Sequence, residues 1–169
     1  NAGTNSSTYV TTTLANSDLV DVILTSSEVC VTRSRDTSNA IRMEVKPYIT
    51  PDVTIVVSPN DTVCDGTSVT FTATPVNGGT TPAYQWQING TNVGTSSTTF
   101  NSSTLANNDI VRVILTSSEM CLTKTMDTSN TITMTVNPNV TPDITITVSP
   151  DDTVCAGTVV SFLANITNG

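Results

Sequence analysis

The chain repeats itself. Residues 1–78 align with residues 92–169 at a constant offset of 91, without a gap, and 47 of the 78 aligned pairs are identical. A period of this length is too long for one turn of a solenoid, but it suits a whole small β domain. The sequence therefore predicts a tandem array of separate modules with a 91-residue repeat.

Side chains that favour extended backbone dominate the composition. Of the 169 residues, 53 are Ser or Thr and 32 are Val or Ile. β-Branched side chains are stiff at χ1 and fit the pleated surface of a sheet better than a helix. We therefore expect an all-β fold.

Two proline-bracketed runs, PYITP and PNVTP, mark the linkers, which we place at 47–51 and 137–142. These positions divide the chain into the C-terminal part of one module at 1–46, a complete module at 52–136 and the N-terminal part of a third at 143–169. Both end pieces leave strand edges without partners, which invites pairing with another chain. We therefore expect the segment to belong to a longer polypeptide or to a polymer.

Alternating polar and apolar residues, punctuated by turn residues, predict the strands of the complete module. They fall at 54–58, 68–74, 84–88, around 93, and at 98–102, 110–116 and 131–136. Six or seven short strands in about 85 residues are typical of a β-sandwich.

Four residues of this module follow the pattern of an immunoglobulin-like domain. Trp86 lies in the third predicted strand, and Leu105, Asp109 and Val113 lead into the sixth. The chain thus resembles that family, which implies that Trp86 and Leu105 fill the core and that Asp109 caps the corner before the sixth strand. A core position for Trp86 is expected over a ligand platform.

The central disulfide of immunoglobulin domains is absent. Val69 or Phe71 in the second predicted strand, and Val113 or Leu115 in the sixth, occupy the places of its two cysteines. An apolar core is expected to replace the bridge.

A narrower resemblance rests on three strings, CDGTSVTF, YQWQINGTNVG and STLANNDIVRV, followed by a late Cys. In this combination the chain is similar to repeats of giant Bacteroidetes cell-surface adhesins, described as polycystic-kidney-disease-like or immunoglobulin-like and including the gliding-motility adhesins. The resemblance covers the whole chain. It implies type IX secretion, exposure on the outer membrane surface, and neighbouring modules of the same filament as partners. Any contact with surface glycans would belong to parts outside this sequence.

The four cysteines, Cys30, Cys64, Cys121 and Cys155, occur without a CxxC pair and without any His, which argues against zinc and for an oxidising compartment. Cys64 precedes the second predicted strand and Cys121 follows the sixth, and immunoglobulin topology runs these strands the same way. A seven-residue strand spans about 23 Å, whereas a disulfide needs Cα atoms within about 7 Å. We therefore expect disulfides between adjacent modules, with free thiols as the alternative.

Five polar residues near the predicted module ends are weaker candidates. Thr62 and Thr153 lie in Asp-Thr-Val strings that resemble Bacteroidetes O-glycosylation acceptors, with turn capping by the Asp as the alternative. Asp52, Asp61 and Asp65 could bind Ca²⁺ at a module joint, although no EF-hand spacing is present. Ordinary turn residues are the alternative, and no cofactor is expected.

Charge and composition narrow the function classes. A net charge of −8 repels nucleic acid and anionic lipid, and no window approaches the apolar length of a membrane span. Without His, the carboxylates of Glu28 and Glu119, each after a Thr-Ser-Ser run, form no catalytic pair identifiable in the sequence. An enzyme is not expected.

A structural stalk repeat of an adhesin is the function that these patterns favour. The alternatives are a carbohydrate-binding sandwich, for which only Tyr48 among seven aromatic residues stands outside a paired core position, and a strand-exchanging polymer subunit. In a strand exchange the two end pieces would lack a counterpart of strand 84–88.

Overall fold

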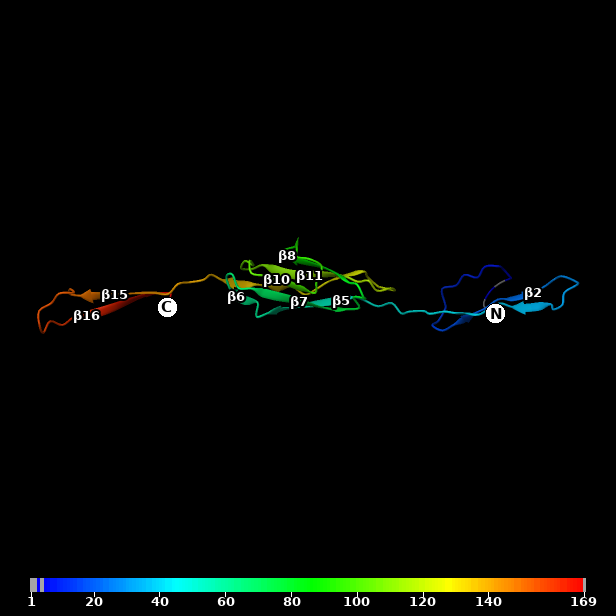
Figure 1. Ribbon diagram of the computed structural model, residues 1–169, viewed down its shortest axis with the longest axis horizontal. Helices are drawn as coiled ribbons and strands as arrows, with labels where there is room; N and C mark the ends of the chain where they lie inside the picture. The colour runs from blue at the N-terminus through cyan, green and yellow to red at the C-terminus, as the bar shows by residue number, and fades with distance from the viewer. Residues whose placement is uncertain (1–2, 4, 169) are drawn as a thin grey trace. The chain divides into compact units, whose positions relative to one another are not determined.

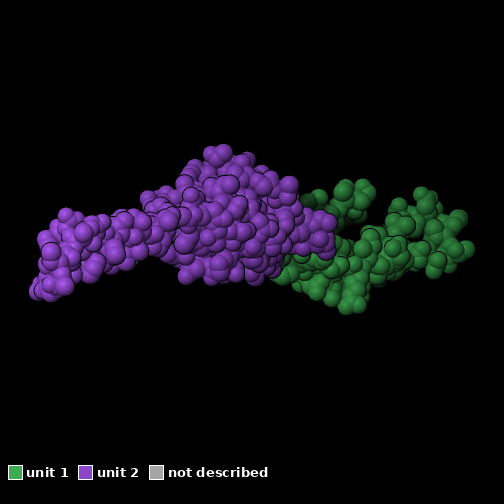
Figure 2. All heavy atoms as spheres, turned by 60° about the vertical axis from the view of Figure 1, so that its left-hand side comes forward, with its two compact units in different colours: residues 1–50, 119–123 green, residues 51–118, 124–169 purple. Residues whose placement is uncertain are grey.

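The computed structural model describes residues 3 and 5–168, and among these residues the regular structure is entirely strand, which confirms the all-β class. The strands are β1 Leu19–Val20, β2 Ile23–Thr25, β3 Arg35–Thr37, β4 Ile41–Arg42, β5 Asp52–Ser58, β6 Thr62–Cys64, β7 Val69–Val76, β8 Ala83–Ile88, β9 Thr91–Val93, β10 Thr99–Ser102, β11 Ile110–Thr116, β12 Met126–Thr128, β13 Ile132–Thr133, β14 Thr135–Asn137, β15 Asp143–Ser149 and β16 Ser161–Thr167. Two compact units result, residues 1–50 with 119–123 and residues 51–118 with 124–169 (Figure 2).

Strands β5 to β14 build what we call the central sandwich (Figure 1). One sheet has the order β10-β7-β5, and the other has the order β12-β11-β8-β9 with β13 also paired to β11. β14 pairs in parallel with β6. Residues of both sheets join one buried apolar cluster, an arrangement consistent with a β-sandwich.

The alternation in the sequence decides which side chains enter this core. In β5, Val53 and Ile55 are buried while Thr54 between them is exposed. In β11, Val111, Val113 and Leu115 are buried, and the residues between them are half-buried. Because successive strand residues point to opposite faces, each strand presents one apolar row to the other sheet.

The chain enters and leaves the central sandwich at opposite ends. The amide of Thr67 donates to the carbonyl of Cys64 at 3.1 Å in the turn that reverses the chain from β6 into β7. β7 runs antiparallel to β5, so β5 and β6 run the same way. β14 is parallel to β6. We therefore name the Asp52 end, where β5 begins, and the Asn137 end, where β14 finishes.

The last predicted strand, 131–136, is wrong as a single element. The chain there forms β13 and most of β14, interrupted at Met134, and the separate strand β12 comes before them at Met126–Thr128. Ile114 of β11 lies opposite Thr128 of β12, whereas Val111 of β11 lies opposite Ile132 of β13. A step of three residues along β11 therefore faces a step of four along the neighbouring chain, and the extra residue is a β-bulge. The side chain of Ser129 in the bulge accepts a hydrogen bond at 3.0 Å from the amide of Val113.

Other boundaries shift by a few residues. β6 was not predicted, because three residues paired on one edge leave little periodic signal. Asn137 belongs to β14, so the linker predicted from 137 begins at 138. The turn between β8 and β9 has positive φ at Asn89 and Gly90, 52° and 81°, as a tight hairpin requires.

The terminal segments repeat strand registers of the central sandwich. In the pair of β15 and β16, Asp143 lies opposite Thr167. This is the register of β5 and β7, in which Asp52 lies opposite Val76, with every residue number higher by 91. The pairing of β2 with β3 has the register of β11 with β12, with every residue number lower by 91. The pairing of β1 with β4 likewise has the register of β11 with β13. We call residues 91 positions apart counterparts, residues 5–46 the N-terminal segment, and residues 143–168 the C-terminal hairpin.

Candidate functional site

Three of the residues that the sequence placed in the core are enclosed there, whereas Tyr9 and Phe162, also predicted as core positions, are 45% and 68% exposed. Trp86, Phe71 and Val113 are fully buried. The ring centroid of Trp86 lies 6.3 Å from that of Phe71 and 5.8 Å from that of Phe100, and the indole N–H donates to the carbonyl of Ser97 at 2.9 Å. Because the ring is enclosed and its polar atom is satisfied, it presents no free face to a ligand.

The corner before β11 is held by Asp109. Its Oδ2 accepts a hydrogen bond from the amide of Ala106 at 2.8 Å, and its Oδ1 accepts one from the side-chain amide of Asn89 at 2.7 Å. Leu105 is buried beside this turn. The counterpart Asp18 makes the same bond to its own turn, at 2.8 Å from the amide of Ala15.

At the Asn137 end an exposed thiol stands beside the departing chain. Cys64 in β6 pairs with Asn137 in β14. The amide of Asp65 donates to the carbonyl of Asn137 at 2.8 Å, and the side-chain amide of Asn139 donates to the carbonyl of Asp65 at 3.1 Å. The first residues of the following linker are thus fixed to β6.

A second exposed thiol stands beside the preceding linker. The amide of Ile49 donates to the carbonyl of Cys121 at 3.0 Å, and the amide of Thr123 donates to the carbonyl of Ile49 at 2.9 Å. Loop 119–123 therefore holds linker 47–51, with Cys121 in the left-handed region at a φ of 59°.

A bridge between Cys64 and Cys121 does not fit within one sandwich. Ser118, three residues before Cys121, donates its amide to the carbonyl of Gly78, directly beyond β7 at the Asp52 end. The eight residues of β7 span about 26 Å, whereas a disulfide allows about 7 Å between Cα atoms. All four cysteines, Cys30, Cys64, Cys121 and Cys155, carry exposed free thiols.

The three carboxylates considered for calcium are not brought together. Asp52 begins β5, whereas Asp61 and Asp65 flank β6 near the Asn137 end. Among residues 3 and 5–168 no three His, Cys, Asp or Glu side chains form a group able to hold a metal ion.

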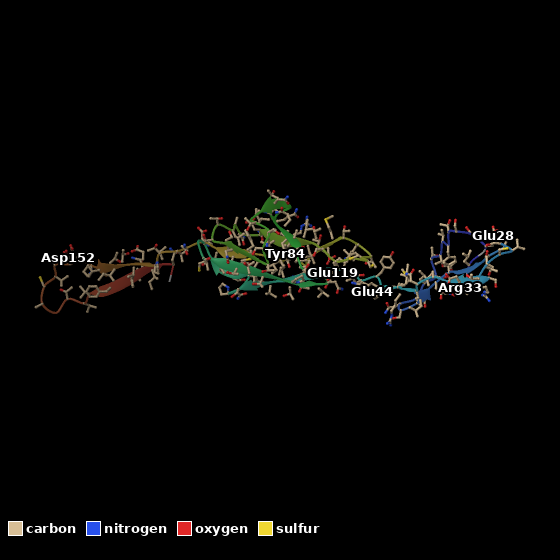
Figure 3. All side chains as sticks on the ribbon, turned by 45° about the vertical axis from the view of Figure 1, so that its right-hand side comes forward. Glu28, Arg33, Glu44, Tyr84, Glu119 and Asp152 are labelled. Atoms are coloured by element: carbon tan, nitrogen blue, oxygen red, sulfur yellow. The ribbon has the colours of Figure 1, made fainter. Side chains whose placement is uncertain are left out.

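The two threonines considered for glycosylation are exposed and hydrogen-bond to the preceding Asp. The hydroxyl of Thr62 donates to Asp61 at 3.2 Å, and that of Thr153 donates to Asp152, which Figure 3 labels, at 3.3 Å. Both hydroxyls remain at the surface, so the same geometry fits a turn cap and a modification site.

Two titratable groups of the central sandwich owe their shifts to structural contacts. Burial raises the pKa of Tyr84. A hydrogen bond from Lys124 lowers the pKa of Asp127, whose Oδ2 also accepts the amide of Val53 at 3.2 Å. Glu28 and Glu119, labelled in Figure 3, lie on loops that follow β2 and β11.

The N-terminal segment exposes an apolar groove. A hollow of about 330 Å³ is lined by Tyr9, Val10, Thr11, Leu14, Val20, Ile41 and Met43. In the central sandwich the counterparts of Tyr9, Leu14, Val20 and Met43 belong to the core cluster, where the ring of Phe71 lies 6.1 Å from that of Phe100. The groove therefore lies where the N-terminal segment lacks the residues that fill the central core.

The C-terminal hairpin exposes the complementary row. Phe162 is 68% exposed, whereas its counterpart Phe71 is fully buried. Ile144 and Ile146 are exposed, and their counterparts in β5 are buried. The repeat and the open strand edges were the sequence signals for these faces, but the residues of the groove were not predicted from the sequence.

No protein-family model matches the sequence, and no curated protein matches it. None of the described residues belongs to a helix with the length and hydropathy that a membrane crossing requires.

Proposed function

We propose that this chain is a segment of an extracellular stalk in which immunoglobulin-like β-sandwich modules follow one another every 91 residues. The stalk would belong to a bacterial cell-surface adhesin of the kind that the YQWQING and LANND strings resemble, including the gliding-motility adhesins. The observation that carries the proposal is the recurrence of strand registers at an offset of 91 on both sides of the central sandwich.

The order of strands supports the immunoglobulin-like assignment. In such domains one sheet holds the first, second and fifth strands and the other holds the third, sixth and seventh. β5, β7 and β10 form the first of these sets, and β8 with Trp86, β11 and the β12–β13 edge form the second. The buried tryptophan on the third main strand and the Asp109 corner agree with this family.

The geometry suits a module that carries tension. The chain enters at the Asp52 end and leaves at the Asn137 end, so a pull on the two linkers acts along the strands. β6 and β14 are parallel neighbours, and such a pull loads their hydrogen bonds in shear, all together, instead of opening them one at a time. The prolines of the linkers restrict bending at each joint.

Cysteines at both linkers support covalent stapling between modules. Val140, the counterpart of Ile49, lies three residues after Asn137, so in a following module the counterpart of Cys121 would lie about 10 Å along an extended chain from the position opposite Cys64. A disulfide needs Cα atoms within about 7 Å, so the proposed bridge requires this stretch of the linker to be less than fully extended. Two thiols would give up two electrons and two protons to a disulfide oxidoreductase of the secretory compartment. Non-reducing peptide mapping of a segment with three whole modules should find this bridge, and a Cys64–Cys121 bridge would contradict it.

Glycosylation of Thr62 and Thr153 is a further part of the proposal, since both hydroxyls are exposed. The intact mass of material from the native host should exceed the polypeptide mass, and an unmodified mass would remove this part.

Sugar binding is not favoured by the surface. Tyr48 is 77% exposed, but its counterpart is Asn139, which binds the carbonyl of Asp65. An exposed aromatic that is not repeated gives no platform along an array.

Location tests the proposed function directly. Antibodies against the chain should label intact cells of the native host, and external protease should remove the label. Deletion of the gene should reduce attachment or gliding. Labelling that requires cell lysis would contradict a surface stalk.

A further inference from the structure

Among the described residues, one long strand edge of the central sandwich has no neighbouring strand. β5 lies at the end of the sheet β10-β7-β5, and it has seven residues. The strands at the other ends of the two main sheets, β9, β10 and β12, have three, four and three residues. A short edge offers another chain little to pair with, whereas a long one presents a row of backbone N–H and C=O groups. β5 is therefore the edge that most needs protection.

The free side of β5 follows from its pairing with β7. Along an antiparallel strand, the backbone groups of successive residues point alternately to the two sides. The amides of Val53 and Ile55 donate to side chains outside this sheet, so positions 53, 55 and 57 face the free edge. Pro75, which has no N–H, lies opposite Val53, as a position without ladder bonds allows.

Side chains from the segment between β12 and β13 cover this edge. The Oδ1 atom of Asn130 accepts a hydrogen bond from the amide of Ile55 at 2.8 Å, and its Nδ2 donates to the carbonyl of Ile55 at 3.1 Å. A side-chain amide offers one acceptor and a donor, as a peptide group does, so Asn130 makes the pair of bonds that a neighbouring antiparallel strand would make. Asp127 accepts the amide of Val53 at 3.2 Å.

The β-bulge directs these side chains to the two sheets. On either side of it, β12 and β13 pair with β11 through their backbones. Within it, the hydroxyl of Ser129 accepts the amide of Val113 at 3.0 Å and donates to the carbonyl of Asn130 at 2.7 Å. Ser129 thus bonds to one sheet while Asn130 bonds to the other, and a bulge is a common way to re-aim a side chain in this manner.

The repeat retains the residues of the bulge. The string Asp-Thr-Ser-Asn at 127–130 recurs unchanged at 36–39, whereas the residues directly before and after it differ between the two copies. The hydroxyl of Ser38 donates to the carbonyl of Asn39 at 2.8 Å, as that of Ser129 does to its own neighbour. The string and its local geometry are therefore kept together where the flanking sequence varies.

We propose that the side chains of Asp127 and Asn130 form a seal that keeps the edge of β5 from accepting a strand of another chain. An incoming strand would have to displace both hydrogen bonds of Asn130 and lie against the charge of Asp127, and charged side chains at a strand edge oppose such pairing. The strand kept out is β5 of a second copy, because two identical edges can pair with each other about a two-fold axis.

The seal has a consequence for a stalk, and this step alone rests on the proposed function. An array with a 91-residue repeat would carry the same edge in every module. Filaments anchored on one surface meet at high effective concentration. With the edge closed, neighbouring filaments can lie side by side without joining into one sheet.

Hydrogen exchange of the full chain tests the two bonds of Asn130. In Asn130→Ala, the amide of Ile55 should exchange at least about tenfold faster relative to the amides of Thr54 and Val56, which face β7. Asn39→Ala makes the same chemical change at the counterpart position and should leave the exchange of Ile55 as in wild type. An unchanged relative rate in Asn130→Ala would overturn the proposal.

A strand probe tests what the seal keeps out. A fluorescent peptide with the sequence of residues 52–58 and a photo-crosslinking group should bind Asn130→Ala about tenfold more tightly than wild type, because two modest hydrogen bonds no longer have to be displaced. The crosslinks gained in the variant should map to β5. A peptide of scrambled order is the control, and equal affinity for the two proteins or gained crosslinks outside β5 would contradict the seal.

Two further variants separate an open edge from general loosening. Asn130→Asp keeps an acceptor for the amide of Ile55 and adds a charge at the edge, so it should bind the peptide as weakly as wild type does. Asp109→Ala removes the hydrogen bonds of a corner outside β5 and should also leave peptide binding unchanged. If either variant bound as tightly as Asn130→Ala, the effect would come from lost stability, and the proposal would fail.

The outcomes for the seal and for the stalk are separable. Peptide binding and hydrogen exchange use purified protein, so they report on the seal whatever the cellular location of the chain. Surface labelling of intact cells reports on the stalk and does not depend on Asn130.

Discussion

The central sandwich and the terminal segments share strand registers but not burial. Val113 is fully buried, whereas its counterpart Val22 is 61% exposed, although Ser129 and Ser38 bond to them in the same way. Strand pairing between neighbours is therefore specified locally, while burial depends on the opposing sheet. Among residues 3 and 5–168, only 52–137 include both sheets, so in this described part the central sandwich alone closes a core.

The largest expected contrast is at the buried phenylalanine. Phe71→Ala should lower the free energy of unfolding by about 3–5 kcal/mol, because it empties the centre of the core. The counterpart change Phe162→Ala should leave the unfolding of the monomer within about 0.5 kcal/mol of wild type. Urea unfolding followed by the emission of Trp86 measures both, and equal losses would contradict the distinction between the two regions.

The bulge serine should show the next largest contrast. Ser129→Ala leaves the buried amide of Val113 without its partner, at a cost of about 1–3 kcal/mol. Ser38→Ala removes the counterpart bond to Val22, where water can replace the hydroxyl, so no measurable change in the urea midpoint is expected. An unchanged free energy of unfolding in Ser129→Ala would mean that this hydrogen bond does not stabilise the bulge.

The corner carboxylate should matter less. Asp109→Ala removes two hydrogen bonds near the surface and should cost about 1 kcal/mol. Asp18→Ala, which removes the counterpart bond to Ala15, is the control, and it should not change the thermal midpoint of the central sandwich. A stability of Asp109→Ala equal to wild type would remove the capping role.

The smallest effect concerns acid. The pKa of Asp127 is lowered by its hydrogen bond from Lys124, so its contribution is present above the unfolded pKa and is lost as pH falls through the folded one. Wild type should therefore lose up to about 1 kcal/mol more than Asp127→Asn when acidified below about pH 4. The counterpart pair Arg33 and Asp36 is exposed on both sides, and Asp36→Asn should have no effect. Parallel acid profiles of wild type and Asp127→Asn would contradict this assignment.

Long periodic strands could be predicted from the sequence, and short edge strands could not. Strands 110–116 and 84–88 were predicted within a residue, because buried positions alternate with less buried ones over most of each strand. β6 and β12 have three residues each, too few for a periodic signal, and β6 also pairs with β14, which is distant in the sequence. Residues 131–136 split because β13 pairs with β11 whereas β14 pairs with β6, a change of partner for which alternation along the chain gives no signal.

The candidate site residues likewise include some that could be predicted from the sequence and some that could not. Trp86, Phe71 and Asp109 could be placed because residue type and position within a strand or turn decide their role. The groove at Tyr9 could not, since it exists because the opposing sheet is missing. The positions of the cysteines beside the two linkers depended on strand order, which the sequence offered only through its resemblance to immunoglobulin-like domains.

One measurement tests the tandem-module account most directly. A fusion of two copies of the chain joined by residues 79–91 places 143–169, 79–91 and 1–46 in succession, the order of one whole module. In dilute solution, hydrogen exchange of the peptide covering 19–25 should split into two equal populations, one as protected as 110–116 and one unprotected. A single unprotected population would contradict the account, because the counterpart strands would then fail to form a core even with every strand present.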